Sequence, residues 1–142
     1  MSKLKGCISV ISSRQECITP CLKSLWENYN HKYDYPVYVN YFDDIYDSEQ
    51  FKSRVASSCP QNVVFSQIPY KTPEFLKESE LFYNRRNLWY VRNSFSINRK
   101  GYLHMCHFMC NMYGYEGTNF EEYDYILTID DESMFVKPMT YD

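Results

Sequence analysis

The chain has 142 residues, a net charge of −3 and an aromatic content of 18%, with 15 tyrosines among the aromatic residues. This length fits one domain with its own hydrophobic core. The acidic balance excludes the basic face by which nucleic-acid-binding proteins usually hold a phosphate backbone. No run approaches the roughly 18 to 20 apolar residues of a membrane-spanning helix. We expect one domain over residues 1–142, with no nucleic-acid partner and no transmembrane segment.

Strands and helices alternate along the first half of the chain. The first strand is predicted by a short β-branched run, and the first helix by Thr19-Pro20, which suits an N-cap followed by a first helical position. Strands are expected at residues 6–12, 36–42 and 61–68, and helices at residues 19–29 and from residue 47 onward. This order is typical of a parallel α/β sheet flanked by helices.

The second half is less regular. The pattern predicts a short helix from Thr72 and a long helix over residues 100–113, with Leu103, Cys106, His107 and Cys110 on one face. A fourth strand at residues 125–129 ends in an acidic cluster. Since ligands bind at the carboxyl ends of strands in open α/β sheets, the residues expected near one edge are Ser12, Arg14, Asp43, Asp44 and residues 130–132. The acidic cluster follows the last predicted strand, close to the end of the sequence. We therefore expect the chain to be part of a longer catalytic domain.

The six cysteines include two pairs at i,i+4 spacing on expected helices, Cys17/Cys21 and Cys106/Cys110. Disulfides and a zinc site are both conceivable for an even number of cysteines. The spacing is longer than that of a zinc knuckle, so we favour buried free thiols. His104 and His107 are expected to pack or form hydrogen bonds rather than bind a metal.

The strongest local signal is the acidic cluster Asp130-Asp131-Glu132 after an apolar strand. Mutual repulsion makes adjacent carboxylates costly without compensation, and Mn²⁺ or Mg²⁺ would supply it. Such a cation could bridge a diphosphate and neutralise the leaving group, as the Asp-x-Asp motif of nucleotide-sugar transferases does. The alternative is a solvated acidic loop. For Asp43-Asp44 the favoured alternative is a helix-capping turn.

The segment at residues 99–108 resembles the Tyr-Arg-His-Met-Cys-Arg-Phe block of the fungal glycolipid 2-α-mannosyltransferases, glycosyltransferase family 15. The matching residues are Tyr102, His104, Met105, Cys106 and Phe108. A second family block falls in register with Tyr123, Phe135, Tyr141 and Asp142. The chain departs from the family at Asp130-Asp131, where the family has Glu-Pro, and at Thr128, where it has Arg.

The resemblance implies a GT-A-like fold, Mn²⁺ (or Mg²⁺), GDP-mannose as donor and a glycan or glycolipid acceptor. It further implies α-1,2-mannosyl transfer with retention of configuration. Asp130 stands at the position of the family's metal- and donor-contacting Glu, and Tyr102 at that of a Tyr that contacts donor or acceptor. Tyr102 is therefore the candidate catalytic residue; Ser12, Arg14, Asp43, Tyr102 and Asp130 are candidate donor contacts, and Asp130, Asp131 and Glu132 are candidate metal ligands. The compartment stays open between the cytoplasm and the Golgi membrane.

Two other functions stay open. A nucleotidyltransferase on the same fold would normally carry a glycine-rich, basic loop after the first strand, whereas residues 12–16 contain no glycine. A non-catalytic α/β module could bind a sugar or nucleotide through its tyrosine-rich surface. Metal-dependent hydrolysis of the donor would separate an enzyme from such a module.

Overall fold

The structure, a computed structural model, describes residues 4–42, 49–69, 99–115 and 117–140, and for residues 99–103 it describes only the helical backbone. The strands are β1 (Gly6–Ile11), β2 (Val37–Tyr41), β3 (Val63–Gln67) and β4 (Tyr125–Asp130). The α-helices are α1 (Gln15–Asn28), α2 (Glu49–Ser58) and α5 (Arg99–Asn111). Short 3₁₀ turns cover Asn30–Lys32, Met112–Gly114 and Phe120–Glu122.

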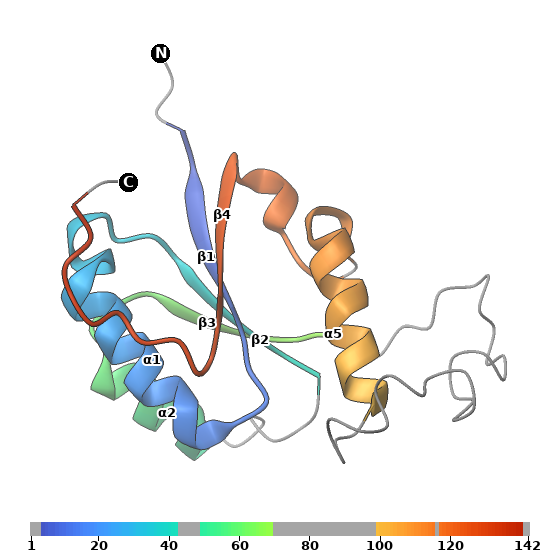
Figure 1. The fold of residues 1–142 in the computed structure, drawn as a ribbon, viewed down its shortest axis with the longest axis horizontal. Coiled ribbons are helices and arrows are strands. Elements are labelled where there is room, and N and C mark those ends of the chain that lie inside the picture. The colour runs from blue at the N-terminus through green and yellow to red at the C-terminus, as the bar shows by residue number, and fades with distance from the viewer. Residues whose placement is uncertain (1–3, 43–48, 70–98, 116, 141–142) are drawn as a thin grey trace, which may run out of the picture.

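The four strands form one sheet in the order β3-β2-β1-β4, and all neighbouring strands run parallel (Figure 1). At the centre, Ile8 of β1 lies opposite Val37 of β2 and Leu127 of β4. The chain first moves from β1 outward to β3, and then returns to the other side of β1 to form β4. The strand order therefore reverses between β1 and β4, which is where open α/β sheets bind their ligands. The expectation of a mostly parallel α/β sheet is confirmed.

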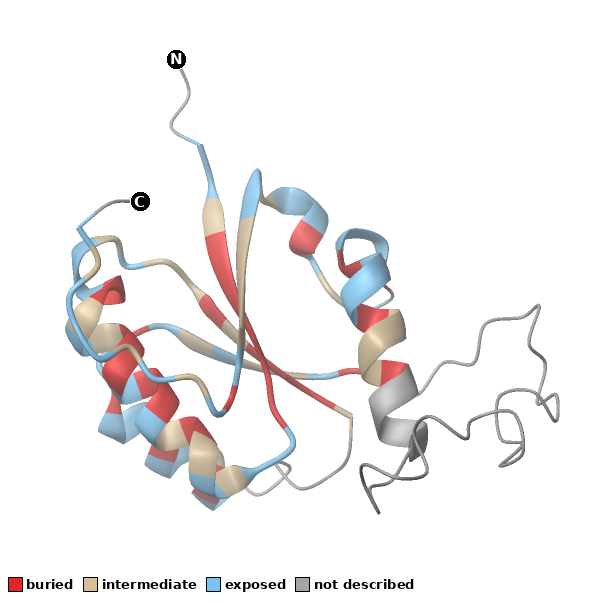
Figure 2. Ribbon diagram, viewed as in Figure 1, coloured by how far each residue is buried: buried red, intermediate tan, exposed pale blue. Residues whose placement is uncertain are grey.

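Helices cover both faces of the sheet, with α1 and α2 on one face and α5 on the other (Figure 1). Buried residues gather on the strands and on the helix sides that face them (Figure 2). On β1, Ile8 and Val10 belong to the α1/α2 core, whereas Cys7 and Ile11 belong to the α5 core. Since side chains alternate along a strand, consecutive residues at the end of any strand face opposite sides of the sheet.

Two helix predictions need correction. Helix α1 begins at Gln15 rather than at Pro20, which lies inside the helix. A proline there removes one backbone hydrogen bond. The extra turn is stabilised by tertiary contacts instead, because Ile18 is fully buried and an acidic side chain accepts hydrogen bonds from the backbone before Gln15.

The predicted face of α5 needs correction at Cys110, which is exposed, whereas Cys106 and His107 are half-buried and the side chain of Leu103 lies outside the described residues. The buried stripe consists of His104 and Phe108 of α5 and Met112 of the 3₁₀ turn that follows. These three residues are spaced by four, as one face of a helix requires. His104 packs in the interior beside the Phe42 ring, 6.5 Å away between centroids. The expected helix at Thr72 lies outside the described residues.

All six cysteines are free, and Cys7, Cys21 and Cys59 are buried, so the expectation of buried thiols holds for these three. Cys17 and Cys106 are half-buried. In the described part of the chain, none of the helices combines the length and apolar character that crossing a bilayer requires.

Candidate functional site

The loop after β1 and the turn after β4 lie side by side at the carboxyl edge of the sheet. Ile11 and Asp130 are partners in the β1–β4 pairing, and the Asp131 amide donates to the Ile11 carbonyl at 3.2 Å. On the other side, the Ser12 amide donates to the Asn40 carbonyl of β2 at 2.9 Å. The structure thus joins Ser12, Arg14 and the acidic cluster, as the sequence predicted.

Asp131 is the most tightly held residue of this edge. Its Oδ2 accepts hydrogen bonds from the Ser12 hydroxyl (2.8 Å), the Ser13 amide (2.9 Å) and the Arg14 amide (3.0 Å). Its Oδ1 accepts one from Arg14 Nη2 at 2.9 Å. The residue is only 2% exposed. The carboxylate therefore sits at the N-terminal end of α1, where unpaired amides and the helix dipole favour a negative charge.

Arg14 forms ion pairs with two acidic residues of the turn after β4, Asp131 and Glu132. While its Nη2 contacts Asp131, its Nη1 donates to Glu132 Oε1. The two partners differ in exposure, since the Asp131 side chain is 3% exposed and that of Glu132 is 60% exposed. The partly exposed Arg14 side chain thus lies between a buried and an exposed carboxylate.

Asp130 points the other way. By strand alternation its side chain lies on the α5 face of β4, together with those of Ile126 and Thr128. It is exposed, and no described residue hydrogen-bonds to its carboxylate. Its carbonyl lies 3.7 Å from Cys21 Sγ. Burial, aided by the nearby charge of Asp131, raises the pKa of the Cys21 thiol to about 12, so this thiol stays protonated.

The chain after the acidic turn folds back along α1 (Figure 1). The Phe135 amide donates to Ser24 Oγ (3.1 Å), and Asn28 Nδ2 donates to the Phe135 carbonyl (2.7 Å). Further along, the Met139 amide donates to the Asn28 carbonyl at 2.9 Å. The acidic turn is thus held by β1 on one side and by α1 on the other.

The three predicted metal ligands do not converge. Among the described residues, no group of three or more His, Cys, Asp or Glu side chains could hold a metal ion. The physical reason is that Asp130 and Asp131 face opposite sides of β4 while Glu132 is turned towards Arg14. Of the three, the exposed Asp130 carboxylate has the free oxygen ligands that Mn²⁺ or Mg²⁺ prefers.

The remaining predicted site residues are placed only in part. The backbone of Tyr102 lies in the first turn of α5, and its side chain is outside the described part of the structure. Asp43 is also outside the described residues. Ser12 is 3% exposed, and its hydroxyl donates a hydrogen bond to Asp131 rather than facing solvent. Sequence reasoning missed the Ser13 amide and the paired role of Arg14 and Asp131, because no local signal links residues 117 positions apart.

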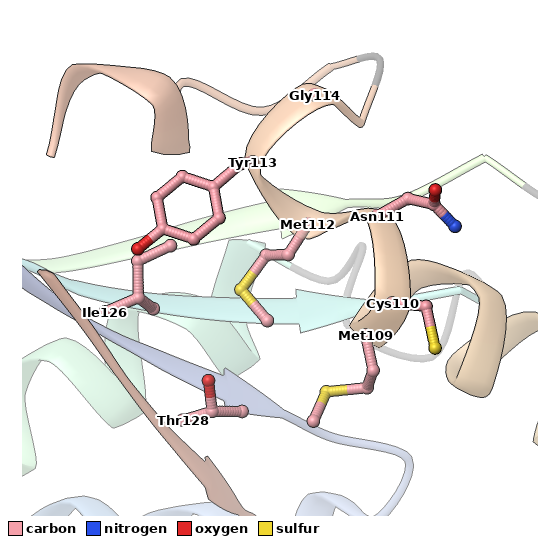
Figure 3. Close-up of a pocket in the computed structure, with 8 residues that line it drawn as sticks. All are labelled: Met109, Cys110, Asn111, Met112, Tyr113, Gly114, Ile126 and Thr128. Atoms are coloured by element: carbon pink, nitrogen blue, oxygen red, sulfur yellow. The ribbon is translucent and has the colours of Figure 1, made fainter. Parts of the chain in front are cut away.

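A separate cavity of about 460 Å³ lies between the end of α5 and β4 (Figure 3). Polar and apolar groups line it in nearly equal parts, and the lining residues are Met109, Cys110, Asn111, Met112, Tyr113, Gly114, Ile126 and Thr128. Thr128 precedes Asp130 by two residues, so the cavity and Asp130 share the α5 face of β4. The Arg14–Asp131 contact lies on the α1 side and is not part of this cavity.

Comparisons with known proteins agree with this architecture. The model of the family described as glycolipid 2-alpha-mannosyltransferase matches residues 1–142. No curated protein matches the sequence.

Solved structures of fungal enzymes share the fold. Core-mannan synthase A (CmsA/Ktr4) from Aspergillus fumigatus, in its Mn/GDP form, superposes with a TM-score of 0.68 at 17% identity, over 92% of this chain and 36% of that one. The mannosyltransferase Ktr4p from S. cerevisiae gives 0.65 at 21% identity, over 99% of this chain and 35% of that one. Its complex with GDP gives 0.63 at 20%, over 99% and 36%. The expected GT-A-like sheet is confirmed, and the chain spans little more than a third of these relatives.

Proposed function

The chain belongs to the glycolipid 2-alpha-mannosyltransferase family, and from that premise we propose that it is the nucleotide-sugar-binding part of a mannosyltransferase. GDP-mannose would be the donor and a glycan or glycolipid the acceptor. The finer proposal is metal-dependent α-1,2 transfer with retention. In support, similar solved structures include a Mn/GDP form of core-mannan synthase A and a GDP complex of Ktr4p.

The observation that carries the proposal is the pair of strand ends at the β1–β4 reversal. This is the place where an open α/β sheet receives a nucleotide. The exposed Asp130 carboxylate stands at this edge, and the next residue, Asp131, holds Arg14 on the other face of the sheet. Asp130 would be a ligand of the divalent cation. The cation would supply charge neutralisation for the diphosphate as the sugar leaves.

A nucleotide-binding titration tests this. GDP binding to the protein should require Mn²⁺, and Asp130→Asn should raise the Kd for GDP in Mn²⁺ about tenfold or more, which corresponds to about 1.4 kcal/mol. Isothermal titration calorimetry with and without Mn²⁺ measures both effects.

The matched control lies at the other end of the same strand. Asp124 is an exposed carboxylate just before β4, where it accepts a hydrogen bond from the Lys5 amide. Asp124→Asn should leave the Kd for GDP within about twofold of the unsubstituted protein, since it is remote from the carboxyl edge. Equal effects of the two substitutions, or no effect of either, would contradict the proposed site. Metal-dependent hydrolysis of GDP-mannose then separates an enzyme from a binding module.

A further inference from the structure

We propose that Asp131 is a positioning residue of the donor site, which holds Arg14 and the loop after β1 in place, and that it is not a metal ligand. The proposal rests on the proposed function, because it assigns roles within the same site. It gives Asp131 a role different from the one that the acidic pattern suggested.

The contacts of Asp131 leave little capacity for a metal. A carboxylate offers about four lone-pair sites, and here four hydrogen-bond donors already use both oxygens. Turning the side chain towards a cation on the α5 face would leave the Ser12 hydroxyl, two loop amides and Arg14 Nη2 without this acceptor. Leaving buried hydrogen-bond donors without an acceptor in this way would lower the stability of the folded protein.

The same contacts occupy two backbone amides that a diphosphate would otherwise find beside α1. The free amides at a helix N-terminus are a common phosphate site. Just before α1, the Ser13 and Arg14 amides already donate to the Asp131 carboxylate, which acts as an internal anion. These two amides are therefore not available to the phosphate oxygens of a donor, for which a cationic side chain at this edge would be another partner.

Arg14 is arranged to be that partner. Its Nη2 is held by the buried Asp131, so the guanidinium keeps its orientation. Its Nη1 contacts Glu132, whose side chain is largely exposed. Ion pairs in solvent stabilise little and exchange readily, and a guanidinium binds phosphate oxygens as well as carboxylates. A phosphate oxygen of a nucleoside diphosphate can thus replace Glu132 while Asp131 keeps Arg14 in place.

A double-mutant cycle on the Kd for GDP in Mn²⁺ tests this role. Asp131→Asn preserves the shape of the side chain and removes its charge, and should weaken GDP binding about tenfold through the loss of a fixed charge-assisted contact. If Asp131 acts through Arg14, then Asp131→Asn made in an Arg14→Lys background should cost less than about threefold. Glu132→Gln should lower the Kd, because the carboxylate that competes with phosphate for Arg14 is gone.

Two results would overturn the proposal. One is a Kd for Asp131→Asn within about twofold of the unsubstituted protein while its melting temperature falls, which is the signature of a purely structural residue. The other concerns the double variant: the factors by which Asp131→Asn and Arg14→Lys each raise the Kd multiply in full. Asp131 would then act independently of Arg14, as a metal ligand would.

A milder variant protects the test against loss of folding. Ser12→Ala removes a single donor to the same carboxylate. If Asp131→Asn does not fold, Ser12→Ala replaces it in the cycle, and its effect on the Kd should disappear in the Arg14→Lys background; an undiminished effect refutes the proposal. Absence of any GDP binding by the unsubstituted protein would remove the proposed function together with this inference, whereas binding with multiplying effects would remove only the role of Asp131.

Discussion

Replacing Phe108 with alanine should destabilise the protein by about 3–5 kcal/mol, the usual cost of removing a buried phenylalanine ring. Phe108 is 0% exposed and belongs to the core under α5. Its ring centroid lies 5.2 Å from that of Tyr115, 6.1 Å from Phe42 and 6.4 Å from Phe120. The ring therefore links α5 to the residue that follows β2 and to both turns that precede β4.

For a chain of this size, the loss corresponds to a fall in melting temperature of roughly 10–17 °C. The assay is thermal unfolding followed by near-ultraviolet circular dichroism, with urea unfolding as a second probe. If the alanine variant does not fold, Phe108→Leu, which keeps most of the volume, should show a smaller fall of a few degrees in the same direction.

Cys110 provides the control on the same helix. It is exposed, so Cys110→Ala should change stability by no more than about 0.5 kcal/mol. The comparison separates the observed buried stripe of α5 from the face that the sequence pattern favoured. Equal destabilisation by Phe108→Ala and Cys110→Ala would contradict the packing of the Phe108 face of α5 against the sheet.

Two further predictions concern reactivity and catalysis. At pH 8, a thiol reagent should modify exposed Cys110 first, and Cys7 and Cys21 only after unfolding, because burial raises the pKa of both thiols to about 12 and keeps them protonated. Intact-mass spectrometry over time measures the order, and early loss of Cys7 would refute it. Tyr102→Phe should lower mannosyl transfer by ~10–100-fold, equivalent to roughly 1.4–2.7 kcal/mol, without a change in melting temperature. Wild-type transfer by this variant would remove Tyr102 from the site.

Much of the architecture follows from short-range patterns. Runs of apolar, β-branched residues marked the four strands to within two residues, because alternation and β-propensity are local properties. The family was recognisable from the block around Tyr102 and His104, since residue identity at fixed spacing is also local. The carboxyl-edge rule by itself predicts that Ser12 and Arg14 lie near the acidic cluster.

Other features were decided by contacts between distant segments. The sequence at Pro20 favours a helix start, yet α1 begins at Gln15 because Asp131, from the far end of the chain, accepts hydrogen bonds from the preceding amides. Likewise, only packing against β2 and the turns before β4 selects Phe108 rather than Cys110 for the core, as both fit a helical period.

The acidic cluster shows the division most clearly. By sequence, Asp130 and Asp131 are adjacent carboxylates with the same chemistry. In the tertiary structure, strand alternation sends one towards the α5 face and the other towards the start of α1. The long connection that returns β4 to the side of β1 then brings Arg14 against Asp131. Local sequence places charges along the chain, but only the pairing of strands far apart in sequence determines which charge is neutralised inside the protein and which stays exposed.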